Sequence, residues 1–199
     1  MKKTTLLFAI AMLSAGSAFA DHQDAEHATM SADQKASHHA EMMQEILNSP
    51  WRTDANKARD VYRHPAETLA FFGVTPHSKV IEIWPGGGWY ADILVPYATK
   101  HGSYTAAVND PASIEKESTK AYYAKANKGL TDKFEANPEV FGKAKLVLID
   151  PAKPVFGKPG SADVVLTFRN EFLQLHYFLL KYQLLWYQTK PDHQIRLSC

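Results

Sequence analysis

Cysteine is almost absent from this 199-residue chain, whose one cysteine is its last residue, Cys199. Because a disulfide needs two cysteines, no bridge can form within the chain, and its stability must come from an apolar core. A surplus of charge is missing as well, since 22 basic and 21 acidic side chains give a formal net charge of +1. Nucleic acids and acidic membrane surfaces both select a basic face, so neither is predicted as a partner.

Long hydrophobic runs are missing too. The apolar run Leu6–Leu13 is well short of the ~20 residues that a bilayer-spanning helix needs. It follows Lys2 and Lys3 and leads to Ala18-Phe19-Ala20, a pattern typical of a secretory signal peptide cleaved after Ala20. An uncleaved anchor is the alternative. We therefore expect residues 1–20 to be removed, the protein to be exported to the periplasm, and no membrane span to remain.

Removal of the leader leaves 20 basic and 21 acidic side chains, a net charge of −1. The stretch that follows, residues 21–45, is polar and contains four histidines, and we expect it to be a flexible arm. Imidazoles bind Zn and Cu, but the spacing of His22, His27, His38 and His39 matches no fixed ligand pattern. A solvated linker is favoured over a metal site, and no metal is predicted.

The most informative stretch is a short strand pattern that runs into three glycines. The β-rich run Val80–Trp84 contains one acid, Glu82, and Gly86, Gly87 and Gly88 follow just before an apolar helical pattern. Glycines reach positive φ and let backbone N–H groups approach a ligand at a helix N-terminus. The pattern predicts strand, tight turn and helix, with a small molecule at the turn. The alternative is that the glycines only close a strand–helix connection.

Apolar patterns elsewhere predict alternating strands and helices. Further strands are expected at 103–108, 145–149 and 163–168, and helices at 55–72, 89–98 and 114–127. Pro65 should start the second piece of the first helix and Gly73 should cap it, Pro96 should kink or end the second helix, and Gly129 should end the third. The order predicts an α/β fold, a Rossmann-like, doubly wound, mostly parallel sheet whose ligands lie beyond the carboxyl ends of its strands.

Two polar features lie near that edge. Asp110 follows the second strand, 24 residues after Gly86, close to the spacing at which nucleotide-binding folds place an acid for ribose hydroxyls. It is also a typical turn residue before Pro111. The polar segment 59–65 is interpreted either as a wall of a substrate site or as an ion-paired helix face.

Two kinds of ligand fit the glycines. The segment 86–91 satisfies G-x-G-x-x-G/A, the fingerprint of dinucleotide binding, in which a pyrophosphate lies at the helix N-terminus. Glu82, four residues before the first glycine, is not part of that fingerprint. A carboxylate at this position suits a cationic ligand with an amino group better than a pyrophosphate.

These residues resemble the class I S-adenosylmethionine-dependent methyltransferases, and in particular an exported group of that family. The resemblance spans residues 52–170, and its segments are Arg59-Asp60-Val61-Tyr62-Arg63-His64-Pro65, Glu67-Thr68-Leu69, Phe72-Gly73-Val74, Glu82-Ile83-Trp84-Pro85-Gly86-Gly87-Gly88-Trp89-Tyr90 and Asp163-Val164-Val165-Leu166-Thr167-Phe168-Arg169-Asn170. By this resemblance the cofactor is S-adenosyl-L-methionine. Glu82 and Gly86 to Gly88 would line its methionine end, and Asp110 would hold its ribose. Trp84 stands where the family motif usually has its first glycine.

The resemblance also implies the reaction, transfer of a methyl group to an acceptor that the sequence does not identify. Such a transfer depends mainly on positioning in a dry pocket. If a base acts, the candidate is His64, whose side-chain type has an unperturbed pKa near neutrality. Arg169 and Asn170, after the fourth strand, are candidates to orient a polar small-molecule substrate. The sequence does not specify the oligomeric state.

The resemblance stops after Asn170, and the tail, residues 171–199, is apolar and aromatic with a helical spacing. It is too short for three more strands with connections, so we expect an incomplete sheet of about four of the usual seven strands and an unpaired edge at the fourth. A truncation or frameshift near this point is the favoured explanation, and an authentic short family member is the alternative. Two classes of function follow. The first is a periplasmic methyltransferase, and the second is a non-catalytic remnant or a domain that binds a nucleotide-type small molecule.

Overall fold

The computed structural model describes residues 30–168 together with 194 and 195. The chain divides into two compact units between His38 and His39. In the first unit, the described residues begin helix α2 (Ala32–Leu47). Ser31 and Gln34 form a reciprocal cap: the Ser31 N–H donates to Gln34 Oε1 at 2.8 Å, and the Gln34 N–H donates to Ser31 Oγ at 3.3 Å.

This helix corrects part of the expectation of a flexible arm over residues 21–45. Polar composition suggested disorder, but the capping pair starts a helix and apolar residues near its C-terminal end stabilise it. In the second unit, Met43 and Ile46 of α2 are 5% exposed and belong to the main core. Residues 21–29 lie outside the described part of the chain.

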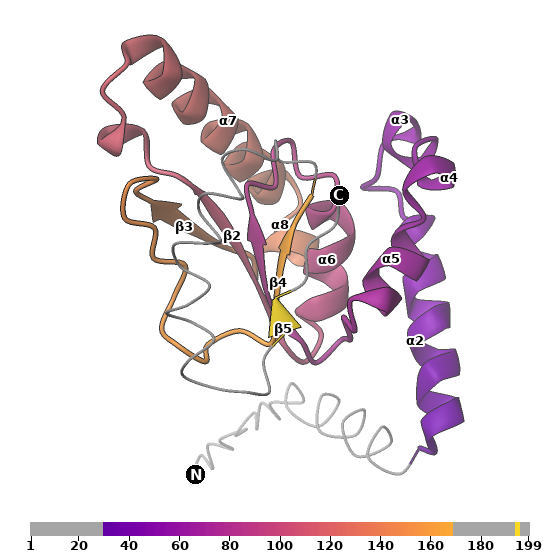
Figure 1. Ribbon diagram of the computed structural model, residues 1–199. Helices are drawn as coiled ribbons and strands as arrows, with labels where there is room; N and C mark the ends of the chain where they lie inside the picture. Colours follow the sequence, from indigo (N-terminus) through magenta and orange to yellow (C-terminus); the bar gives the residue numbers. More distant parts are fainter. Residues whose placement is uncertain (1–29, 169–193, 196–199) are drawn as a thin grey trace, which may run out of the picture. The chain divides into compact units, whose positions relative to one another are not determined.

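A five-stranded parallel sheet is the centre of the second unit (Figure 1). Its strands are β1 (Lys79–Ile83), β2 (Ser103–Asn109), β3 (Lys145–Ile149), β4 (Val164–Thr167) and β5 (Gln194–Ile195). Their order is β3-β2-β1-β4-β5. The chain therefore builds outward from β1 through β2 to β3, then crosses back to place β4 on the other side of β1. This order confirms the predicted Rossmann-like α/β fold and puts the topological switch point between β1 and β4.

Alternate residues of the strands face two separate cores. Val80, Tyr104 and Leu166 point to the larger core, which the helices also line. Ile81, Ile83, Ala107 and Ile149 point to the smaller one. That second core is completed by Phe156 and Ala162 from the connection between β3 and β4, which has no helix. Strand β1 is therefore buried on both faces, as expected for a central parallel strand.

The helices before and after β1 agree with the predicted positions, with two corrections. The first is the predicted helix over 55–72, which consists of α3 (Asp54–Lys57), α4 (Asp60–Arg63) and α5 (Pro65–Phe71). As predicted, Pro65 starts the last piece, and Gly73 follows it at φ +67°. The second correction is α6 (Ala91–Ala98), which continues through Pro96. Proline there removes the donor to the Asp92 carbonyl, and the indole N–H of Trp51 replaces it at 3.0 Å.

The third predicted helix, over 114–127, differs more from the observed structure. After the 3-10 turn η1 (Pro111–Ser113), helix α7 runs over Glu117–Ala136, so Gly129 lies inside it and the prediction that Gly129 ends it was wrong. The packing of Leu130, which is 2% exposed, outweighs the modest cost of glycine in a helix interior. A short helix α8 (Pro138–Phe141) then leads to β3.

The fourth strand is not the unpaired edge that we expected. Val164 and Val165 of β4 pair with Gln194 and Ile195 of β5 in parallel register. The rest of the tail, including the helix predicted there and any consequence of a truncation near Asn170, lies outside the described residues. No helix in the described part of the chain is long and apolar enough to cross a membrane.

Candidate functional site

The three glycines form a tight bend at the carboxyl end of β1, as the sequence predicted. Gly86 has φ +58° and Gly88 has φ +75°, and the Gly88 N–H donates to the Pro85 carbonyl at 3.0 Å. The Gly88 carbonyl accepts from the Asp92 N–H at 3.1 Å, so the bend continues directly into α6. The bend therefore lies next to the switch point, where open α/β sheets bind their ligands.

The three glycines lack a side chain for different reasons. At Gly88 an added Cβ would lie 2.9 Å from Leu130 Cδ1, because α7 packs directly on the bend. At Gly86 the space is open but the positive φ favours glycine. Gly87 has neither reason: its φ is not positive, nothing lies within 4 Å of an added Cβ, and the residue is exposed. The folded chain thus leaves open backbone at Gly86 and Gly87, which a ligand can approach closely.

Backbone donors are available at the same place. Within the described residues, the N–H groups of Gly86 and Gly87 donate to no protein acceptor. Both belong to the bend that leads into α6, so they add two donors near the N-terminal end of a helix.

A lysine holds the inner side of the bend. The ammonium of Lys133, on α7, donates to the carbonyls of Gly87 at 3.1 Å and Gly88 at 3.0 Å. It also lies 2.6 Å from Oδ1 of Asp92, whose side chain is 1% exposed. Burial raises the pKa of Asp92, while Lys133 and Asn56 oppose that rise. The bend therefore has an ammonium enclosed by two carbonyls and one buried carboxylate.

Glu82 lies below the bend, fully enclosed by the larger core. The Tyr104 hydroxyl donates to Glu82 Oε2 at 2.7 Å. Burial raises the pKa of Glu82 to about 7, against smaller lowering effects from Tyr104 and Lys133. The proximity to the bend agrees with the sequence prediction, but the carboxyl group is 2% exposed and directed at a protein hydroxyl. Its role as a ligand contact remains a prediction.

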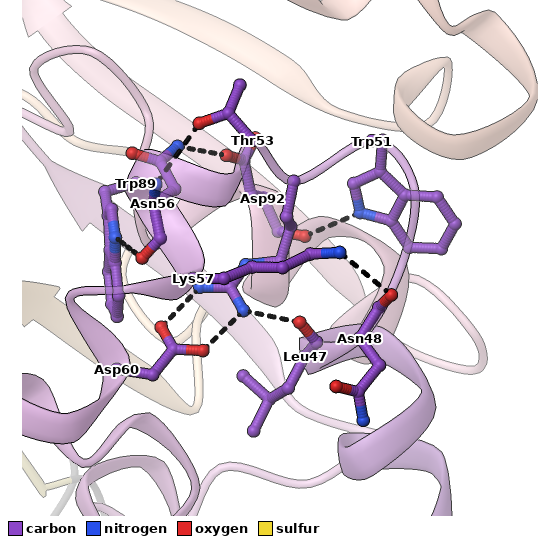
Figure 2. Close-up of polar contacts among 10 residues, drawn as sticks. Leu47, Asn48, Trp51, Thr53, Asn56, Lys57, Asp60, Trp89 and Asp92 are labelled. Carbon is purple, nitrogen blue, oxygen red and sulfur yellow. Dashed lines mark hydrogen bonds and ion pairs between the residues drawn. The ribbon is translucent and has the colours of Figure 1, made fainter.

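The segment before β1 is fixed to α6 by a polar network (Figure 2). The Asn56 amide donates to Asp92 Oδ2 at 3.1 Å, and the Trp89 indole donates to the Asn56 carbonyl at 3.0 Å. Arg52, whose side chain is fully buried, donates to both oxygens of Asp60 at 2.7 and 2.6 Å. Of the two interpretations of segment 59–65, this part matches the ion-paired helix face.

Aromatic rings extend the network along the bend. The guanidinium of Arg63 lies 4.4 Å from the Trp89 ring centroid and 5.9 Å from that of Tyr90. The Tyr90 ring stacks on Phe168, just after β4. These contacts connect the bend to the end of β4, on the far side of the switch point. They also exclude water from the start of α6, where Trp89 and Tyr90 are buried.

His64, the predicted base, lies at the junction between α4 and α5. It has φ +43° between α4 and α5, and its side chain is exposed. Its backbone, rather than its imidazole, accounts for its role in the fold, since its carbonyl accepts from the Thr68 N–H at 2.8 Å. A catalytic role for His64 remains a prediction, as it does for Arg169 and Asn170, which lie outside the described residues.

Trp84 bridges the carboxyl ends of β1 and β2. It has φ +52°, a conformation that glycine adopts more readily, and its indole N–H donates to Asn109 Oδ1 at 2.9 Å. Asp110 follows Asn109, and its Oδ1 accepts from the Ala112 N–H at 2.9 Å, as a turn aspartate does. A ligand that runs from the glycine bend to Asp110 would therefore pass the Trp84 indole.

Sequence reasoning missed Lys133, Asp92, Asn56 and Trp51. Lys133 is 45 residues beyond Gly88, and no local spacing relates it to the bend. The one available signal was Asp92, an acid in the first turn of an apolar helix. Among the described residues, no group of three or more histidine, cysteine or acidic side chains could hold a metal ion.

Comparisons with known proteins identify no family for the chain. No family model matches it, and no curated protein matches it. Among solved structures, a SAM-dependent methyltransferase from Aquifex aeolicus is 15% identical, with a TM-score of 0.42 over 63% of this chain and 55% of its own. Coclaurine N-methyltransferase bound to N-methylheliamine and SAH is 12% identical, with a TM-score of 0.45 over 89% and 46%.

A third solved structure is P. horikoshii TYW2 in complex with MeSAdo, 19% identical, with a TM-score of 0.41 over 65% of this chain and 39% of its own. The chain thus spans about half or less of the length of these three proteins. Likeness at this level identifies neither a ligand nor a reaction. The fold assignment rests on the strand order of the chain itself.

Proposed function

We propose that the chain binds S-adenosyl-L-methionine at the glycine bend and is a methyltransferase of a small-molecule acceptor. One observation supports this most: Gly87, at the carboxyl end of β1 and beside the switch point, is a glycine for which neither backbone conformation nor internal packing gives a reason. Close approach of a ligand would explain why this position is a glycine. The resemblance of the sequence to the methyltransferase motif specifies which ligand.

The chemistry around the bend suits an adenosyl sulfonium amino acid. The free N–H groups of Gly86 and Gly87 can donate to its carboxylate, and the acceptors around Lys133 can take an ammonium. Asp110 follows the neighbouring strand, where its second carboxylate oxygen can accept from ribose hydroxyls. The chain's part in the reaction is to hold the cofactor and exclude water, because methyl transfer needs orientation more than a base.

Titration calorimetry tests the binding. We expect the full chain to bind S-adenosylmethionine and S-adenosylhomocysteine and not NAD. The substitution Gly87→Ala should abolish or strongly weaken binding while stability changes by less than about 0.5 kcal/mol, since its Cβ meets no protein atom. Gly129→Ala is the matched control: it too adds a Cβ in open space, but within α7. Wild-type affinity in Gly87→Ala, or no binding in the wild type, would contradict the proposal.

A nucleotide-binding protein without turnover is the second candidate, favoured by the G-x-G-x-x-A match at 86–91. Formation of a product distinguishes the two candidate functions. Formation of S-adenosylhomocysteine from S-adenosylmethionine with a mixture of small acceptors supports the transferase, whereas tight binding without product supports the second candidate. The three positions His64, Arg169 and Asn170 are tested in the same assay by substitution with Gln, Lys and Ala.

Export to the periplasm is a separate proposal that rests on residues 1–20. If the leader is cleaved after Ala20, protein recovered from the periplasmic fraction should begin at Asp21 by intact mass. Recovery of the uncleaved chain from the cytoplasm would contradict it.

A further inference from the structure

The ammonium of Lys133 occupies a place that is built for an ammonium group. Three acceptors surround it: the carbonyl oxygens of Gly87 and Gly88, at 3.1 and 3.0 Å, and Oδ1 of Asp92, at 2.6 Å. Asp92 is held in position by Asn56 and by its own N–H bond to Gly88. The acceptor set belongs to α6 and to the bend that precedes it, whereas the lysine comes from α7.

The lysine holds this set through its charge. Oδ1 of Asp92 is fully buried, and its contact with the ammonium is an ion pair at 2.6 Å. An ammonium on another stem could form the same ion pair and keep both carbonyl contacts.

The lysine is also able to leave. Its side chain is 24% exposed, whereas that of Asp92 is 1% exposed, so solvent reaches the lysine side of the contact. The open backbone at Gly86 and Gly87 lies at the same bend.

From these contacts we infer that the carbonyls of Gly87 and Gly88 and the carboxylate of Asp92 form a subsite for a primary ammonium, which Lys133 fills in the free chain and which the ligand's ammonium takes over on binding. The inference rests on the proposed function, because it concerns the amino acid part of the same ligand. Lys133 is then a built-in competitor that weakens every ligand with an ammonium group and does not affect ligands without one. Only a ligand with an ammonium group can replace Lys133 and bind the three acceptors itself.

The test compares two ligands that differ in the amino acid part. S-adenosylhomocysteine has an ammonium and a carboxylate, and 5′-methylthioadenosine has neither. In the full chain with Lys133→Met, we expect calorimetry to show about tenfold tighter binding of S-adenosylhomocysteine, as for a subsite that was open a tenth of the time. Binding of 5′-methylthioadenosine should be unchanged.

Two variants control for charge and folding. Lys128→Met removes a lysine of α7 that pairs with Asp132 and does not touch the bend, so it should leave both affinities at the wild-type values. Asp92→Asn combined with Lys133→Met removes the carboxylate as well and should abolish the gain for S-adenosylhomocysteine. Thermal unfolding of each variant confirms that it is folded.

The other outcomes each contradict the inference in a recognisable way. If Lys133→Met weakens both ligands equally, the lysine holds the bend in shape. If it weakens only S-adenosylhomocysteine, the lysine pairs with the ligand's carboxylate. In both cases the proposed function stands. If no variant and no wild-type chain binds either ligand, the proposed function fails and the inference fails with it.

Discussion

At the scale of single residues, Glu82 is a buried acid whose ionisation its environment opposes. Burial raises its pKa from 4.5 to about 7 in the folded chain. Between these two values the folded state keeps a proton that the unfolded state releases. The free energy of unfolding therefore falls as pH rises from 4.5 to 7 and is constant above, with a total loss of about 3 kcal/mol from this group.

The substitution Glu82→Gln should remove this dependence. The amide oxygen can still accept from Tyr104, and no proton is lost as pH rises. At pH 8 we expect the variant to be more stable than the wild type by up to about 3 kcal/mol, and at pH 4 the difference should disappear. Urea denaturation at several pH values measures it, with the exposed Glu117→Gln as control. Parallel pH profiles for wild type and Glu82→Gln would show that the carboxyl group is already ionised in the folded chain.

The glycines of the bend give a second prediction at this scale. Gly86→Ala places a side chain at φ +58° and should cost about 1 kcal/mol of stability, although no atom obstructs it. Gly87→Ala should cost much less, because its φ is not positive. Equal losses of stability in the two variants, measured by chemical denaturation, would contradict the different reasons assigned to these neighbours.

At the scale of elements, α6 depends on a donor from outside the helix. Pro96 cannot donate to the Asp92 carbonyl, and the Trp51 indole does so instead. Trp51→Phe should therefore cost about 1–3 kcal/mol by leaving this carbonyl without its donor. In that background Pro96→Ala should restore part of the loss, since the new backbone N–H can donate to the same carbonyl.

A double-mutant cycle measures this coupling. Pro96→Ala alone should change stability little, because the indole already occupies the acceptor. We expect the two substitutions together to be less destabilising than the sum of the single effects by at least about 0.5 kcal/mol. Additive effects would show that Trp51 stabilises the helix through packing alone.

The elements also show which sequence signals were sufficient. The strand 145–149 was predicted with the bounds that the structure has, and Pro65 and Gly73 delimit α5 as predicted. Each of these depends on neighbours within a few residues. The failures at Pro96 and Gly129 have the opposite cause, since a donor from Trp51 and the packing of Leu130 override the local preference.

At the scale of the whole molecule, the sequence predicted the parallel α/β sheet but not the contacts that surround the glycine bend. Alternating strands and helices were enough to predict a parallel sheet with a glycine bend at the end of β1. They could not reveal that Lys133 reaches the bend, because that contact depends on how α7 crosses the sheet. Nor did they predict β5, whose first residue, Gln194, lies 27 positions after Thr167, the last residue of β4.

The central claim is that the open backbone of the bend binds an adenosyl amino acid. The most direct measurement is a crystal structure of the full chain with S-adenosylhomocysteine. We predict density for the ligand against Gly86 and Gly87, with its ammonium at the carbonyls and its ribose near Asp110. Density for the protein with an empty bend, or with the Trp84 indole across it, would contradict the account.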